Sequence, residues 1–185
     1  HRGARREVIV ASGAFQTPQL LMLSGVGDAA ALGKHGINSV HHLPGVGANL
    51  QDHPDFVFGY MSDNPNFNGL SLKGIPRLLR AISQYRRERR GPMTSNFAEC
   101  GGFLKTRPDL DVPDIQLHFG MAMADDHGRK RHNGTGFSMH VCLLRPKSRG
   151  NVALGSADPF AAPLIDPNFL GDEADLESMV AGFKI

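Results

Sequence analysis

The feature that most constrains the fold is a series of short strand-like segments between residues 56 and 155, with one long helical pattern among them. Apolar and polar residues alternate in these segments, and turn-forming residues separate them, which is typical of strands. Successive strands with so little helix between them favour antiparallel pairing. We therefore predict an α+β fold whose antiparallel sheet is flanked by helices. The predicted strands are 56–62, 96–105, 114–124, 136–145 and 151–155, and the predicted helix is 76–90.

Composition and charge exclude several classes of protein. Hydrophobic residues make up 41% of the chain and charged residues 21%, as in folded globular domains. The formal charge is only +2, and many of the basic residues lie in 76–90, where apolar residues at helical spacing leave the arginines on the other face. A solvated helix face explains this run, so we expect no nucleic-acid partner. The two cysteines have no CxxC spacing, which indicates neither a disulfide framework nor a zinc site.

The N-terminal part of the chain has a different pattern. Residues 8–11 form a short apolar, β-branched run that predicts a buried parallel strand ending in a tight turn. We expect the next helix to begin with Thr17 as its N-cap and Pro18 at its first position, and a second helix near 29–35. Strand, turn and helix in this order favour an α/β unit. The glycine-rich segment 44–54 then marks the expected domain crossover.

Several blocks of the sequence resemble the glucose-methanol-choline (GMC) oxidoreductases. The most specific block is 13–27, in which a small residue, Thr17-Pro18, an aliphatic pair and Ser24-Gly25 have the spacing of the family's second signature. Residues 46–53 and 145–152 resemble two further blocks, in family order. Residues 97–103 and 113–119 are similar to strands of the choline dehydrogenase and bacterial alcohol dehydrogenase branch. The resemblance covers nearly the whole chain.

The resemblance implies an FAD-dependent enzyme that oxidises a primary alcohol, choline-like or aliphatic, to an aldehyde. In the family a histidine base takes the hydroxyl proton while hydride passes to the flavin. The chain has no counterpart of the GxGxxG turn that binds FAD or of the region with the catalytic histidine. We therefore expect an internal piece of a longer enzyme, with no catalytic residue of its own, no activity and no retained FAD.

The same resemblance implies a domain organisation. Residues 1–52 are expected to be a portion of the FAD-binding domain, and residues 53–170 a substrate-binding domain with the antiparallel sheet. Residues 171–185 are expected to begin a helix that leads back to the FAD-binding domain.

Two polar segments contain the candidates for contact with FAD. The turn after the first predicted strand can bring the backbone close to a ribose or phosphate because glycine is conformationally permissive, although a plain strand-to-helix turn is the alternative. The polar residues of the glycine-rich segment can shape the flavin crevice or simply bond their own backbone in Asx-turns. The candidates are Ser12, Gly13, Ala14, Thr17, Asn49, Asp52 and His53.

Glu99, His118 and Gln116 are the candidates for contact with the substrate. Apolar residues at 115, 117, 119 and 121 share one face of their predicted strand, so Gln116 and His118 point to the other face. An acidic residue such as Glu99 is costly inside a strand unless it is paired or faces water. The resemblance implies that Glu99 meets a quaternary ammonium group and that His118 orients the alcohol. A structural ion pair of Glu99 with an arginine, and a structural role for His118, remain the alternatives.

Two other classes of function remain open from the sequence. One is a stand-alone ligand-binding module, and the other is a metal-dependent hydrolase. The metal hypothesis is weak, because His41 and His42 are adjacent in a strand and point to opposite faces, and the remaining candidates have no fixed ligand spacing. These remaining candidates are Asp125, Asp126, His127 and His132.

The sequence also leads to expectations about binding partners and cellular location. A small-molecule alcohol is the expected partner, and the sequence allows a homo-oligomer and leaves the electron acceptor open. We expect a cytoplasmic protein, with membrane association of the longer enzyme left open.

Overall fold

The computed structural model describes residues 3–4, 6–64, 67, 69–70, 74–96, 98–123, 130 and 134–185. The chain divides into two compact units. The first unit contains His1–Asp52 and Pro146–Glu173, and the second contains His53–Arg145 and Ala174–Ile185. This division differs from the expected domains, because residues 146–173 belong with the first unit rather than with a continuous domain over 53–170. The chain therefore passes between the units more than once.

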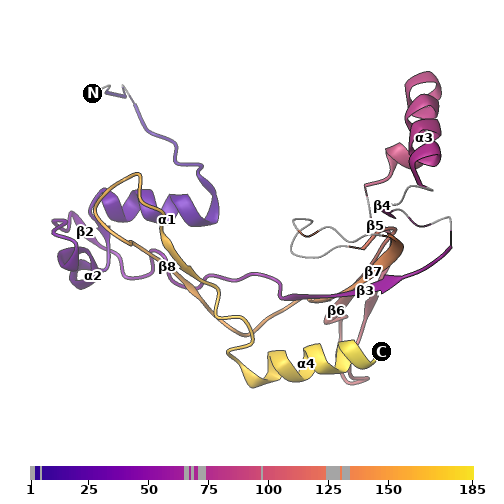
Figure 1. The fold of residues 1–185 in the computed structure, drawn as a ribbon. Coiled ribbons are helices and arrows are strands. Elements are labelled where there is room, and N and C mark those ends of the chain that lie inside the picture. The colour runs from indigo at the N-terminus through magenta and orange to yellow at the C-terminus, as the bar shows by residue number, and fades with distance from the viewer. Residues whose placement is uncertain are drawn as a thin grey trace. The chain divides into compact units, whose positions relative to one another are not determined.

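The second unit is built on an antiparallel sheet with the strand order β3-β7-β6-β5 (Figure 1). β7 lies in the interior of the sheet because it pairs with β3 on one side and β6 on the other. The predicted antiparallel sheet is confirmed, and four of the predicted strands form it. The strands are β3 (Asp55–Met61), β5 (Ala98–Leu104), β6 (Ile115–Gly120) and β7 (Gly134–Leu143), and the short β4 (Gly69–Leu70) also pairs with β7.

Helix α4 (Glu173–Lys184) covers one face of this sheet (Figure 1). Gly182 allows the close approach, since a Cβ atom at this position would lie 2.9 Å from Cγ1 of Ile115. Phe183 adds an aromatic contact, with its ring centroid 4.6 Å from that of Phe58. The expected helix at 171–185 is thus present, and in the structure it packs on the sheet of the second unit. The buried core between helix and sheet consists of Ile115, Val141, Leu143 and Met179.

Helix α3 (Ile75–Glu88) matches the predicted basic helix and is followed by the short 3-10 helix η2 (Pro92–Thr94). It ends at Glu88, because its C-cap residue Arg89 adopts a left-handed conformation (φ 55°). The apolar side chains of its first turns are exposed, including Leu78 at 53% and Leu79 at 62%. In the described ranges, no helix is long and apolar enough to cross a membrane.

The first unit combines short helices with two small sheets. Strands β1 and β2 pair in parallel, and strands β8 and β9 pair antiparallel. Met22, Leu32 and Leu154 form its buried core. The elements are α1 (Gly13–Leu23), β1 (Val26–Gly27), α2 (Ala29–Lys34), β2 (His41–His42), β8 (Asn151–Ala153) and β9 (Leu164–Asp166).

Backbone contacts explain why residues 146–173 pack in the first unit. The N–H of Val152 donates a hydrogen bond of 2.7 Å to the carbonyl oxygen of Gly47, and Leu50 and Gly150 form an antiparallel bridge. Gln19 of α1 also donates its side-chain amide to the carbonyl of Ala161 at 2.8 Å. These bonds connect the beginning and the middle of the segment to the N-terminal part of the chain.

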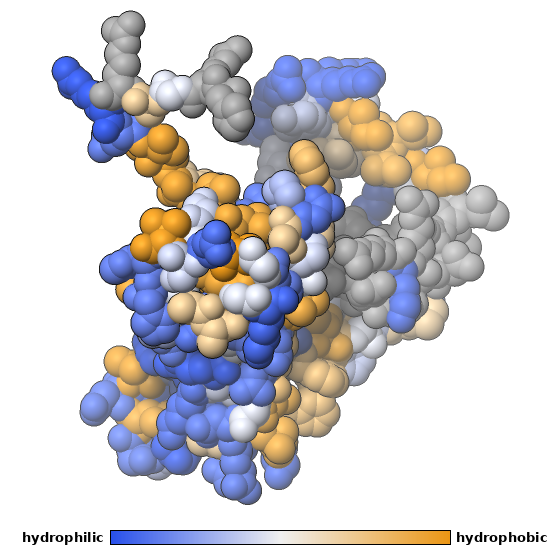
Figure 2. Space-filling view, turned by 90° about the vertical axis from the view of Figure 1, so that its left-hand side faces the viewer, coloured by the Kyte–Doolittle hydropathy of each residue, from blue (hydrophilic) through white to orange (hydrophobic). Residues whose placement is uncertain are grey.

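The predicted buried strand at 8–11 is wrong for this structure. The segment forms no strand, and Val8 and Ile9 are 77% and 81% exposed. Figure 2 shows hydrophobic residues along this projecting N-terminal segment. A strand needs a neighbour for its hydrogen bonds, and no described residue pairs with this one.

The predicted start of the first helix is also wrong. Helix α1 begins at Gly13, and its N-cap is Ser12 rather than Thr17. Gly13 has a positive φ of 78°, which allows the extended chain to turn directly into the helix. Pro18 therefore lies inside the helix, and the hydroxyl of Thr17 accepts a hydrogen bond of 3.2 Å from the N–H of Ser12. The second helix, α2, lies where it was expected.

Candidate functional site

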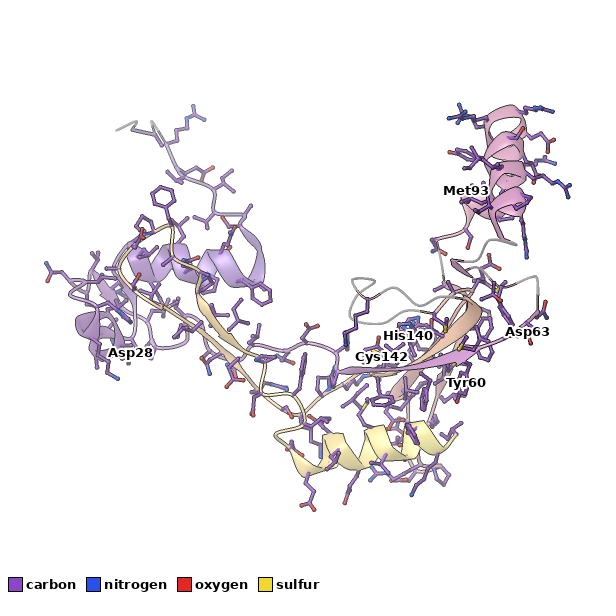
Figure 3. The ribbon with its side chains drawn as sticks, in the orientation of Figure 1. Asp28, Tyr60, Asp63, Met93, His140 and Cys142 are labelled. Atoms are coloured by element: carbon purple, nitrogen blue, oxygen red, sulfur yellow. The ribbon has the colours of Figure 1, made fainter. Side chains whose placement is uncertain are left out.

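The face of the β3-β7-β6-β5 sheet opposite α4 carries a row of polar side chains, which we call the polar face. Strand alternation places Gln116 and His118 of β6 here, away from the core residue Ile115, as predicted. His140 of β7 lies directly opposite His118, and Figure 3 shows His140 and Cys142 on the side of the sheet away from α4. The polar face therefore brings two imidazole rings together.

His140 is held on both sides by polar groups. Its Nδ1 lies 2.7 Å from Oδ2 of Asp55 on the neighbouring strand β3. Its Nε2 lies 3.5 Å from Oγ of Ser138, a fully buried residue. Because a carboxylate oxygen only accepts hydrogen bonds, Nδ1 carries the hydrogen and donates it to Asp55. In the neutral imidazole, Nε2 is then an acceptor for the Ser138 hydroxyl.

The two neighbours of His118 across the sheet are very different. On one side the rings of His118 and His140 meet edge to face, with centroids 6.1 Å apart and an angle of 88°. On the other side His118 pairs with Gly101 of β5, which has no side chain. The half-buried ring of His118 therefore has an aromatic neighbour on one side and no side chain opposite it on the other. Gln116, two residues earlier, lies opposite Cys142 and Phe103.

Glu99 lies at an irregular position of β5, where the pairing with β6 shifts register between Ala98 and Cys100. Such a bulge changes the direction of a side chain, and bulges are frequent beside binding sites. Glu99 is exposed. Within the described ranges it makes no ion pair or hydrogen bond, so the structural ion pair with an arginine is not seen there.

The candidates around the start of α1 lie together in an exposed turn. Ser12 makes no side-chain cap to the helix, and no acidic residue lies in the first turn. A Cβ atom at Gly13 would have no neighbour within 4 Å. Ala14 is exposed in the first turn. The backbone of this turn is therefore open to a ligand, whereas the Thr17 hydroxyl is engaged with Ser12.

The candidates in the glycine-rich segment lie on either side of the boundary between the two units. Asn49 has a positive φ of 58° and belongs with Asp52 to the first unit. His53 belongs to the second unit, where its Nε2 lies 3.1 Å from the carbonyl oxygen of Leu144. This contact gives His53 a local structural role.

The described ranges contain no group of three or more histidine, cysteine, aspartate or glutamate residues that could hold a metal ion. His42 instead uses Nδ1 to accept a hydrogen bond of 3.1 Å from the N–H of Ala29. The other residues of the metal hypothesis, Asp125, Asp126, His127 and His132, lie outside the described residues.

Two residues of the polar face, Asp55 and His140, were not expected from the sequence. Alternation within 136–145 puts His140 on the same side as Ser138 and Cys142, but only the register of β7 against β6 places it beside His118. Asp55 begins β3 and meets His140 diagonally across the strand pair. The alternation that puts His140 on this face can be read from the sequence, whereas the strand register that brings it beside His118 and Asp55 cannot.

Comparison with known proteins identifies the family. Sequence models of the GMC oxidoreductases match residues 1–55 and 146–185. The chain belongs to the GMC oxidoreductase family. Among its GMC relatives, the alcohol dehydrogenase [acceptor] of Pseudomonas putida is 50% identical over 97% of this chain and 32% of its own length. The mitochondrial choline dehydrogenase of Mus musculus is 41% identical over 93% of this chain and 29% of its own length.

Solved structures of this family share the fold. A structure of formate oxidase from Aspergillus oryzae, from work on the modification of its FAD, aligns with a TM-score of 0.84 and 31% identity. The alignment covers 98% of this chain and 36% of that enzyme. The chain thus spans about a third of the length of the curated relatives and solved structures that it matches.

Proposed function

We propose that this chain forms part of the FAD-binding domain and the substrate-facing wall of a flavin-dependent oxidoreductase that oxidises a primary alcohol to an aldehyde. The observation that carries the proposal is the polar face, on which His118 lies between the ring of His140 and the bare backbone of Gly101. The similarity to alcohol and choline dehydrogenases supports the substrate class. The similarity to formate oxidase supports FAD as the cofactor.

The residues around the start of α1 fit the phosphate part of FAD. Backbone N–H groups at a helix N-terminus attract phosphate, and here neither a side-chain cap nor an acidic residue competes for them. The open space at Gly13 lets a ligand approach the backbone. We assign contact with FAD to Ser12, Gly13 and Ala14, while Thr17 holds the turn in place. FAD, when bound, supplies the acceptor for the hydride of the alcohol.

The polar face contributes binding and orientation rather than proton abstraction. His118 is half-buried and free of hydrogen bonds to the described residues, so its ring nitrogens are available to the alcohol hydroxyl. Gln116 adds an amide on the same face, and Asn49, Asp52 and His53 remain proposed contributors to the flavin crevice. We place the proton-accepting base in another part of the enzyme.

A flavin measurement tests the proposal. We expect the full-length enzyme to purify with the visible spectrum of oxidised flavin and to lose that absorbance when a primary alcohol is added without oxygen. The isolated chain of 185 residues is expected to purify without flavin. Retention of FAD by the isolated chain would contradict the assignment of the main cofactor site to other parts of the enzyme. The proposed function would be contradicted if no primary alcohol reduced the flavin of the full-length enzyme.

Glu99 provides a test of the substrate class. An exposed carboxylate at the bulge of β5 attracts a cationic alcohol such as choline more strongly than a neutral one. In the full-length enzyme, Glu99→Gln is expected to raise KM for a cationic alcohol roughly tenfold and to leave KM for a neutral aliphatic alcohol nearly unchanged. Steady-state kinetics with both substrates measures the difference. An equal change for both alcohols rules out recognition of charge by Glu99.

A further inference from the structure

The Asp55–His140 pair has no role in the function proposed above, although it lies next to the residue that orients the substrate. The side chains are 37% and 19% exposed, respectively, and the pair is joined by a contact of 2.7 Å. Pairs this exposed contribute little to stability when they lie on an ordinary surface. This pair lies instead on the polar face, where its effect on neighbouring side chains matters more than its own energy.

Contacts at both ring nitrogens restrict the orientation of the His140 imidazole. The bond to Asp55 fixes the hydrogen on Nδ1, and Ser138 faces Nε2 from a fully buried position. A rotation of the ring about its χ2 angle breaks both contacts. Carboxylates fix the tautomer and ring orientation of histidines in the same way at metal sites.

His118 depends on this orientation because His140 is its main neighbour on the polar face. Directly opposed residues of antiparallel strands have Cβ atoms roughly 5 Å apart, so their side chains contact each other. The edge-to-face packing with His140 fixes one side of the His118 ring, and Gly101 offers nothing on the other. No hydrogen bond to another described residue holds His118.

We propose that Asp55 and His140 are positioning residues for His118. Asp55 locks the His140 ring, and the locked ring sets the rotamer in which His118 meets the alcohol. This inference rests on the proposed function, because it assigns the pair a role in the binding of the same substrate. It assigns neither residue a contact with the reacting atoms.

A double-mutant cycle in the FAD-loaded, full-length enzyme tests the proposal. Asp55→Ala is expected to lower kcat/KM for the alcohol roughly tenfold when His118 is present, since small misplacements of an orienting group reduce rates strongly. In a His118→Ala background the same substitution is expected to change kcat/KM less than about twofold, because the group that Asp55 acts through is gone. Equal effects of Asp55→Ala in the two backgrounds overturn the proposal.

Two further variants separate positioning from general damage. Asp55→Asn keeps an acceptor for Nδ1 of His140 and is expected to retain most of the activity lost in Asp55→Ala. An Asn variant as impaired as the Ala variant overturns the positioning role. Asp63→Ala removes the same charge from an exposed site just after β3 and is expected to leave kcat/KM unchanged.

The outcomes also distinguish this inference from the proposed function. If none of the alcohols tested reduces the flavin of the unsubstituted enzyme, the proposed function fails. If an alcohol does reduce the flavin but the effects in the double-mutant cycle are additive, only the positioning role fails. If Asp55→Ala loses its flavin, His140→Ala supplies the cycle with His118→Ala instead, and additivity in that cycle equally overturns the proposal.

Discussion

Replacement of His118 by alanine in the full-length enzyme is expected to lower kcat/KM for a primary alcohol roughly 100-fold while the FAD content stays the same. His118 is the side chain of the polar face whose nitrogens are available to the substrate, and loss of an orienting group can reduce the rate by about this factor. The sheet tolerates the substitution because the ring is only half-buried and belongs to the face away from the α4 core. Steady-state kinetics and the flavin absorbance of each preparation measure the two quantities.

Two control variants make this result specific to His118. His118→Gln keeps an amide able to hydrogen-bond the alcohol, so its loss of kcat/KM is expected to be smaller than that of His118→Ala. His41→Ala removes an exposed imidazole from β2 in the first unit and is expected to have no effect. If His118→Ala retains full activity, the polar face does not orient the alcohol and the assignment of His118 is wrong.

The substitution Gly47→Ala is expected to destabilise the first unit by about 3 kcal/mol. Gly47 has a positive φ of 84°, which strains any other residue, and a Cβ atom would lie 2.1 Å from the carbonyl oxygen of Val152. The added methyl group must separate the two segments and break the 2.7 Å bond from Val152 to Gly47. The thermal unfolding midpoint of the variant, compared with that of the unsubstituted protein, measures this loss of stability.

Gly45→Ala is the matched control for this prediction. It adds the same methyl group two residues earlier, where no atom lies within 4 Å and φ is not positive. This variant is expected to unfold within a few degrees of the unsubstituted protein, because an unstrained Gly-to-Ala change is neutral or mildly stabilising. Equal unfolding midpoints for the two variants would show that the contact between Gly47 and Val152 does not hold the segment 146–173 in place.

The sheet of the second unit was predictable because its strands carry their pattern locally. Alternation in β6 separates Ile115 from Gln116 and His118, and burial of Ile115 in the core confirms the assignment. Helix α3 was predictable for the same reason, since its apolar and basic residues have helical spacing. In each case the period of the side chains determines the element without knowledge of its neighbours.

Features that depend on pairing were not predictable. The partnership of His118 with His140 follows from the register of β6 against β7, which no single segment encodes. The segment 8–11 has the composition of a buried strand, but the described residues provide no partner for it. The start of α1 was misplaced because Thr-Pro resembles a helix start, whereas Gly13 permits an earlier turn.

The alternation of the chain between its two units has a consequence for the order of folding during synthesis. The first unit joins residues 1–52 with residues 146–173, and the sheet of the second unit is covered by a helix from 174–185. The contacts of residues 1–52 with residues 146–173 therefore cannot all form until residue 173 has left the ribosome, and those of α4 with the sheet follow later still. Contacts between such distant parts of the chain slow folding and leave apolar surface exposed for longer. A nascent chain of this kind has greater need of chaperones than one whose domains follow each other in sequence.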